Sequence, residues 1–230
     1  MFFIAPIYPH AKITYGYKAQ YATAEDNSQL LAPADKIFIQ ELTGTFLYYA
    51  RAIDATMLPA LGLLANQQAA PTENAMTLAK QFLDYAATHP DAIITYHASD
   101  MVLSAHSNAS YLSESKERSR AGGQFFMSNN SPIPYNNVAV VTIYQIIKAV
   151  MSSAAEAKLG DLFINCREAI PERHALKAMG HEQPPMPMQT DNTTAHGVVS
   201  NNIESKRMKS MDMNLHWLRC RIAQKQFCHY

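Results

Sequence analysis

The sequence has few cysteines, no excess of charge of either sign and no long hydrophobic run. Its 230 residues include three cysteines, and Lys plus Arg equal Asp plus Glu at 19 each. Three cysteines without a CxxC pair exclude a disulfide framework and a zinc ribbon. Balanced charge removes any argument for a polyanionic partner from net charge alone. No apolar run approaches the ~20 residues of a membrane span, so we expect no membrane partner.

The N-terminal segment gives no sign of export. The first ten residues, MFFIAPIYPH, lack a basic segment and contain an early proline, which is not the pattern of a secretory signal. We therefore expect an intracellular location, in the cytoplasm or the nucleus.

Hydrophobic spacing predicts a helical first third. Residues 1–35 contain scattered prolines without a sustained period and are interpreted as a connecting arm. Apolar residues at steps of three and four predict one helix over 36–54 and a second over 55–68. A third helix is expected to start at the Pro-Thr-Glu sequence of residues 71–73. The segment 36–90 gathers no carboxylates, so we interpret it as packing or a partner surface.

After residue 90 the pattern changes to that of a mixed sheet with helices. Short runs rich in β-branched and aromatic residues predict strands at 92–97, 101–107, 124–128 and 138–147. Helical spacing returns over 153–170, followed by a short helix over 171–179 closed by Gly180 and a brief strand ending at Asp191. This order predicts an α+β fold, with a second domain over 91–230.

Two acids stand where a sheet-based metal site would need them. Glu156 lies in the first turn of a helix, three residues before Leu159 and seven before Phe163, so it points towards the sheet. Asp191 ends a predicted strand, and carboxylates placed in this way can hold catalytic metal ions. The alternative is that Glu156 favours the helix dipole and that Asp191 caps the next helix.

Six motifs follow one another in a fixed order from residue 36 onwards. The first two are ELTGTFLYYARAIDATML, with Gly44, Arg51 and Asp54, and APTENAMTLAKQFLDYAATHPD. The third is HSNASYLSESKERSRAGGQFFMS, a hairpin with two adjacent phenylalanines. The last three are MSSAAEAKL, QTDNTTA and KSMDMNLHWLR. In this order they resemble the Pol polyprotein of Ty1/copia-type retrotransposons, from the end of the reverse transcriptase into the RNase H domain.

The resemblance implies a fold, a cofactor and partners. It implies a segment like the reverse transcriptase thumb or connection, followed by an RNase H-like domain. An acidic cluster of that family binds two Mg2+ and hydrolyses the RNA strand of an RNA/DNA hybrid. The match of MSSAAEAKL and QTDNTTA to the family's motifs implies that Glu156 and Asp191 are two of its metal-binding catalytic acids. The implied partners are the hybrid and the remainder of the Pol polyprotein.

Several positions depart from the family pattern. Asn108 stands where the family has a metal-bridging aspartate, so this catalytic position carries a neutral amide. Lys158 replaces another acid usual in the family, and its helical phase predicts only a surface change. The chain ends at Tyr230, before the family's fourth acid, and the polymerase Tyr-x-Asp-Asp motif is missing. A truncated, degenerate copy with impaired nuclease activity and no polymerase activity is therefore expected.

Basic residues near the C-terminus are candidates for nucleic-acid contact. They are Lys206, Arg207, Lys209 and Arg219. The alternative is a solvated helix face on which Asp212 pairs with Arg219. A zinc site made of His216, Cys220, Cys228 and His229 also stays open, although the spacing matches no standard finger.

Two further functions compete with the impaired nuclease. One is a non-catalytic RNase H-like module that binds RNA/DNA hybrids or a protein partner. The other is an active nuclease in which an acid such as Glu114 compensates for Asn108.

Overall fold

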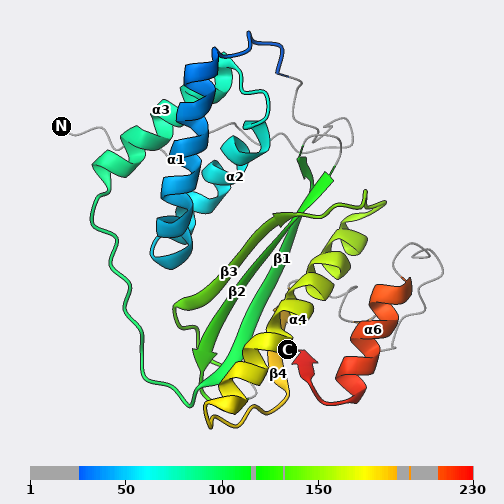
Figure 1. Ribbon diagram of the computed structural model, residues 1–230. Coiled ribbons are helices and arrows are strands. Elements are labelled where there is room, and N and C mark those ends of the chain that lie inside the picture. The colour runs from blue at the N-terminus through cyan, green and yellow to red at the C-terminus, as the bar shows by residue number, and fades with distance from the viewer. Residues whose placement is uncertain (1–25, 115–117, 132, 191–196, 198–211, 230) are drawn as a thin grey trace. The chain divides into compact units, whose positions relative to one another are not determined.

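The chain divides into two compact units, each described here by itself. The computed structural model describes residues 26–114, 118–131, 133–190, 197 and 212–229 (Figure 1). Unit 1 spans Met1–Ile94 and unit 2 spans Thr95–Tyr230. Within the described ranges, no helix is both long and apolar enough to cross a membrane.

Unit 1 is helical, as its spacing predicts. Its elements are α1 (Pro33–Ala52), the 3-10 turn η1 (Ala55–Met57), α2 (Leu58–Gln67) and α3 (Glu73–Thr88). Pro33 lies at the start of α1, where its missing N–H costs no helical hydrogen bond. The Thr72 hydroxyl accepts a hydrogen bond from Ala75 N and caps α3. The rings of Phe46 and Phe82 meet edge to face at 4.9 Å between the helices.

Unit 2 contains a five-stranded mixed sheet. Its strands are β1 (Val102–Glu114), β2 (Arg118–Ser128), β3 (Ala139–Ile146), β4 (Met186–Thr190) and β5 (Phe227–His229), in the order β3-β2-β1-β4-β5. The first three strands form an antiparallel meander. β4 runs parallel to β1, and β5 runs parallel to β4. The predicted α+β class, with a helical segment followed by a mixed sheet and flanking helices, is confirmed.

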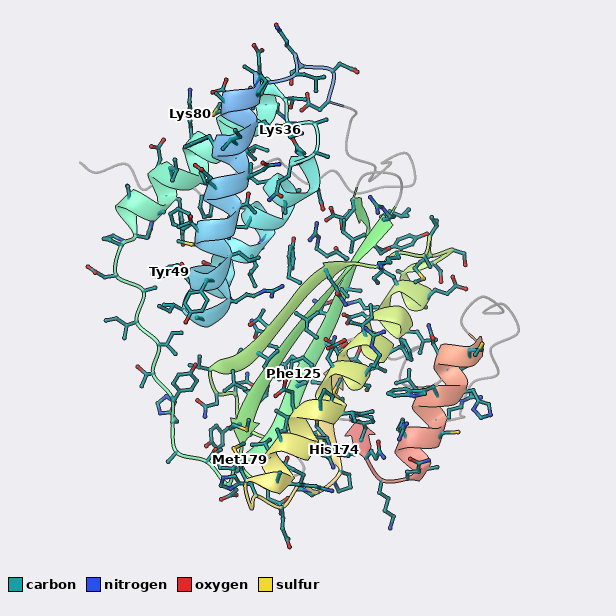
Figure 2. All side chains as sticks on the ribbon, viewed as in Figure 1. Lys36, Tyr49, Lys80, Phe125, His174 and Met179 are labelled. Carbon is teal, nitrogen blue, oxygen red and sulfur yellow. The ribbon has the colours of Figure 1, made fainter. Side chains whose placement is uncertain are left out.

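The sheet in unit 2 is accompanied by helices α4 (Ala154–Ala178) and α6 (Asp212–Ala223), seen beside the strands in Figure 1. The largest core lies between α4 and the sheet, where Leu103, Phe125, Leu159 and Leu162 are fully buried. Figure 2 labels Phe125 in this layer between sheet and helix. The stripe predicted from Leu159, Leu162 and Cys166 is therefore the face that packs on the strands.

The helix predicted over 153–170 continues through Pro171, so the prediction of a separate short helix is wrong. Pro171 lies inside α4, although proline removes one helical hydrogen bond. The buried Arg173 side chain donates to Pro184 O at 2.6 Å and to Gln183 O at 3.2 Å, which fixes the second half of α4 to the following loop. Gly180, at φ +92°, then ends the helix with a bond from His181 N to Leu176 O.

The strand predicted over 92–97 is also wrong, because residues 91–100 form no regular element. The His97 backbone is bonded to the Asn137 side chain instead of a neighbouring strand. β propensity alone does not make a strand without a pairing partner. Conversely, β1 and β2 extend further into the predicted turn than expected, and β5 was not predicted.

Candidate functional site

Asn108 and Lys158 meet at the position where the resemblance expects acids. Asn108 lies in β1 opposite Gly122 of β2. Its Oδ1 atom accepts a hydrogen bond from Lys158 Nζ, which reaches it from the second turn of α4. The prediction that Lys158 is only a surface change is therefore wrong. Lys158 lies three residues before Asp161, which is bonded to β1 and β2, so its position on α4 faces the strands.

Glu156 participates in the start of α4. Its side chain is buried, and its Oε2 atom accepts a hydrogen bond from Ser152 N at 2.9 Å. In return, the Ser153 hydroxyl accepts from Glu156 N at 3.2 Å. This reciprocal arrangement resembles a capping box. The described contacts of Glu156 are thus those of an acid at the start of a helix, and its role as a metal ligand stays a prediction.

The other predicted acid lies outside the described residues. Thr190, the last residue of β4, is paired with Ser107 of β1, one residue before Asn108. Asp191 follows Thr190 in the sequence and is not among the described positions. The same holds for three of the predicted nucleic-acid contacts, Lys206, Arg207 and Lys209. Their proposed roles therefore stay predictions.

A buried polar network lies beside the Asn108–Lys158 contact and joins α4 to two strands. Asp161 is 1% exposed. Its carboxylate accepts from the Ser107 hydroxyl of β1 and from Gly122 N of β2, the latter at 3.0 Å. The Asn165 amide donates to Asp161 Oδ1 at 3.0 Å and to Ser107 Oγ at 3.0 Å. No part of this network was predicted from the sequence.

Burial makes Asp161 an unusual acid. Desolvation raises the pKa of its carboxyl from 3.8 to about 7, because the charged form loses water that the network only partly replaces. The hydrogen bonds from Ser107 and Gly122 and the positive charge of Lys158 act in the opposite direction and lower the pKa. Near neutral pH the carboxyl group is therefore divided between its neutral and charged forms.

Close backbone approach explains the glycine pair of β2. A Cβ atom at Gly123 would lie 2.0 Å from Asn165 Oδ1, and one at Gly122 would lie 3.1 Å from Asn108 O. Glycine within a strand often marks such an approach. The two glycines, with polar Asp161 inside the apolar stripe of α4, are the sequence signals that could have indicated this network.

Glu114, the candidate for a compensating acid, belongs to a buried ion pair. Its Oε1 atom lies 2.6 Å from Arg120 Nε, and both side chains are about 5% exposed. The Arg120 guanidinium also stacks 4.2 Å from the centre of the Tyr144 ring on β3. This ion pair joins β1 to β2 within the hairpin. The described contact of Glu114 is that of a structural acid.

The C-terminal helix α6 has mainly packing contacts. Trp217 meets Phe163 of α4 edge to face at 5.2 Å, in agreement with a packing role for this ring. Arg219 is half-buried in the same helix. Of the group considered for zinc, His216 Nδ1 lies 3.3 Å from Cys220 Sγ, whereas Cys228 Sγ contacts Pro185 O.

The described residues do not fit a two-metal site. Magnesium prefers carboxylate, carbonyl and water oxygens. Here the amide oxygen of Asn108 is held by an ammonium, and the carboxylate of Glu156 is held by a backbone N–H. Across the part of the chain that the structure describes, no three His, Cys, Asp or Glu side chains gather in a way that could hold a metal ion.

Comparisons with known proteins give weak likenesses. No family model matches the chain, and no curated protein matches it. One similar structure is RNase H1 from the halophilic archaeon Halobacterium salinarum, at 10% identity and a TM-score of 0.33, covering 56% of this chain and 84% of that chain. Another is the prototype foamy virus protease-reverse transcriptase, at 9% identity and a TM-score of 0.32, covering 65% of this chain and 23% of that chain.

Proposed function

We propose that this chain is a Ty1/copia-type retrotransposon Pol fragment whose RNase H-like domain has lost most of its hybrid-cleaving activity. In the family, Mg2+-dependent hydrolysis removes the RNA strand of an RNA/DNA hybrid. The ordered motifs support the origin, and the mixed sheet with α4 and α6 supports the fold. The contact between Lys158 and Asn108 supports the loss of activity.

Electrostatics explain why this contact opposes metal binding. An amide in place of a carboxylate removes one negative charge, and a lysine in place of an acid replaces a negative charge by a positive one. Two unit charges 4 Å apart interact by roughly 4 kcal/mol at an effective dielectric constant of about 20, and a dication doubles that value. Asn108 and Lys158 therefore make the site much less attractive to Mg2+ than two acids at these positions would.

The experiment is cleavage of a labelled RNA/DNA hybrid in Mg2+. It compares the native chain with Asn108→Asp, Lys158→Glu and the double variant, each with and without a C-terminal segment taken from the family. Asn108→Asp alone is expected to stay inactive, because the new carboxylate would pair with Lys158. The extended double variant is expected to cleave at least about 100-fold faster than the native chain, which corresponds to about 2.7 kcal/mol of transition-state stabilisation.

The controls separate repair of this site from unrelated nuclease activity. Glu156→Gln in the extended double variant is expected to abolish cleavage if Glu156 is a metal ligand as proposed. Cleavage by the native chain at the rate of the double variant would contradict the proposal. If the native chain cleaves and Glu114→Gln stops it, the compensating-acid function is the correct one.

The second candidate function is a binding module that does not cut. Lys158 favours it, because an ammonium next to a strand residue is suited to contact with a phosphate. Tight hybrid binding without cleavage by any of the repaired variants would support this function over a decayed nuclease.

A further inference from the structure

One side of α1 is exposed although part of it is apolar. The side chains of Ile37 and Tyr48 on this side are 53% and 81% exposed. Ile39, Leu42 and Ala50 of the same helix are buried. At 3.6 residues per turn the two sets lie on opposite sides of the helix. α1 therefore packs into unit 1 with one side and leaves the other side open to a partner.

The open side of α1 has the spacing of a contact between two helices. Exposed residues follow one another along it at alternating steps of four and three, namely Ile37, Glu41, Gly44, Tyr48 and Arg51. This alternation places the side chains in one straight line, as along the seam of paired helices. We call these five residues the α1 stripe. Its spacing favours a second helix as the occupant.

The middle of the α1 stripe is hollow because Gly44 has no side chain. An open cavity of about 460 Å3 lies there, lined by Gly44, Leu47, Tyr48, Arg51 and Ala52. A Cβ atom added to Gly44 would meet nothing within 4 Å. The hollow can therefore receive a bulky side chain from a partner helix.

The α1 stripe is complementary to itself when two copies run antiparallel. Position 46 lies midway between Glu41 and Arg51, and also midway between Gly44 and Tyr48. A two-fold axis through this point puts Glu41 opposite the partner's Arg51 and Tyr48 opposite the partner's Gly44. Within one helix Glu41 and Arg51 are about 15 Å apart, as 1.5 Å per residue gives, and do not pair with each other. Parallel helices would instead bring like charges together.

We propose that the α1 stripe is the interface of an antiparallel homodimer, in which Tyr48 fills the partner's hollow at Gly44 and Glu41 pairs with the partner's Arg51. The occupant is a second copy of this chain, because both the charges and the hollow fit the stripe itself. A contact limited to one helix of each chain is at the small end of specific interfaces, which bury roughly 1,200–2,000 Å2 in total, so the dimer is weak. The inference concerns unit 1 and does not depend on the nuclease activity proposed for unit 2.

Sedimentation velocity of the full-length chain at increasing concentration measures the dimerisation. The native chain is expected to dimerise with a micromolar Kd. Glu41→Arg and Arg51→Glu each bring like charges opposite one another, so each variant alone is expected to dimerise at least about 10-fold more weakly. An equimolar mixture of the two variants is expected to regain the native affinity, because every charge in the mixed dimer meets its opposite.

Matched variants outside the α1 stripe serve as controls. Asp84→Arg makes the same change of charge at an exposed position of α3 and is expected to keep the native affinity. Tyr48→Ala leaves the hollow empty and is expected to weaken dimerisation about 10-fold or more. Tyr96→Ala removes a ring that is 56% exposed outside α1 and is expected to change nothing.

Three outcomes would overturn the inference. One is a native chain that stays monomeric up to roughly 100 μM, well above a micromolar Kd. Another is a mixture of Glu41→Arg and Arg51→Glu that dimerises no better than either variant alone, with both variants shown by circular dichroism to keep their helices. The third is an equal loss of affinity in Asp84→Arg, which would assign dimerisation to total charge and not to the α1 stripe.

Discussion

At the scale of single residues, Asp161 links the stability of unit 2 to pH. Its carboxyl is 1% exposed, and burial raises its pKa to about 7 from 3.8. Between these two values the folded chain binds more protons than the unfolded chain. Stability is therefore greatest at the acidic side of this window and falls as the pH rises through 7. The maximal slope is about 1.4 kcal/mol per pH unit.

Asp161→Asn is expected to flatten this pH dependence. The amide can accept from Gly122 N and donate to Ser107 Oγ, so the network keeps most of its bonds without a buried charge. Urea unfolding at pH 5, 6, 7 and 8, followed by the fluorescence of Trp217, measures the effect. Trp217 is the only tryptophan and packs on Phe163 of α4, so it reports on unit 2.

The control for Asp161→Asn is Asp84→Asn, at an exposed position of α3. This variant is expected to follow the native pH profile. If the Asp161→Asn profile also ran parallel to the native one, burial of Asp161 would not be the source of the pH dependence.

At the scale of elements, the contact between β2 and α4 requires glycine at position 123. Gly123→Ala would bring a Cβ atom to 2.0 Å from Asn165 Oδ1. Asn165 cannot move away without losing bonds to Asp161, Ser107 and Gly122 O. We expect a loss of about 1–3 kcal/mol from such overpacking, measured by urea unfolding with Trp217 fluorescence.

A matched glycine in α1 should behave in the opposite way. A Cβ atom at Gly44 would meet nothing within 4 Å, and alanine favours a helix over glycine by roughly 0.5–1 kcal/mol. Gly44→Ala is therefore expected to slow amide hydrogen exchange in α1 and to leave unit 2 unchanged. Equal unfolding midpoints for Gly123→Ala and the native chain would contradict the close packing of β2 on α4.

At the scale of the whole molecule, we propose that the two units are separate domains joined after residue 90. Residues 91–100 have no regular secondary structure, and Tyr96 among them is 56% exposed. Chymotrypsin under limiting conditions is expected to cut first at Tyr96, because cleavage needs a locally extended backbone. Mass spectrometry of the fragments locates the cut.

Tyr48 provides the internal control for this cleavage. It is 81% exposed but lies within α1, so its backbone is protected by helical hydrogen bonds. Cleavage at Tyr48 as early as at Tyr96 would show that exposure alone decides, and it would remove the support for a boundary at residues 91–100.

The sequence by itself determined the α+β class and most of the elements. Periods of 3.6 and 2.0 residues and start signals such as the Pro-Thr-Glu sequence of residues 71–73 are local, and they placed α1, α2, α3 and the start of α4 near their observed bounds. The residue pattern also directed attention to Glu156, and the family resemblance directed attention to Asn108. Local signals failed for 92–97, which has β propensity without a partner strand, and for Pro171, whose surroundings keep α4 continuous.

Only the tertiary structure decided what the candidate site contains. Asn108 and Lys158 are 50 residues apart in the chain, and their contact depends on how α4 packs on β1. Asp161 becomes an acid with a raised pKa because packing removes its water and brings Ser107 and Gly122 to it. The contact of Lys158 and the desolvation of Asp161 both depend on how α4 packs on the strands, which local signals in the sequence do not give.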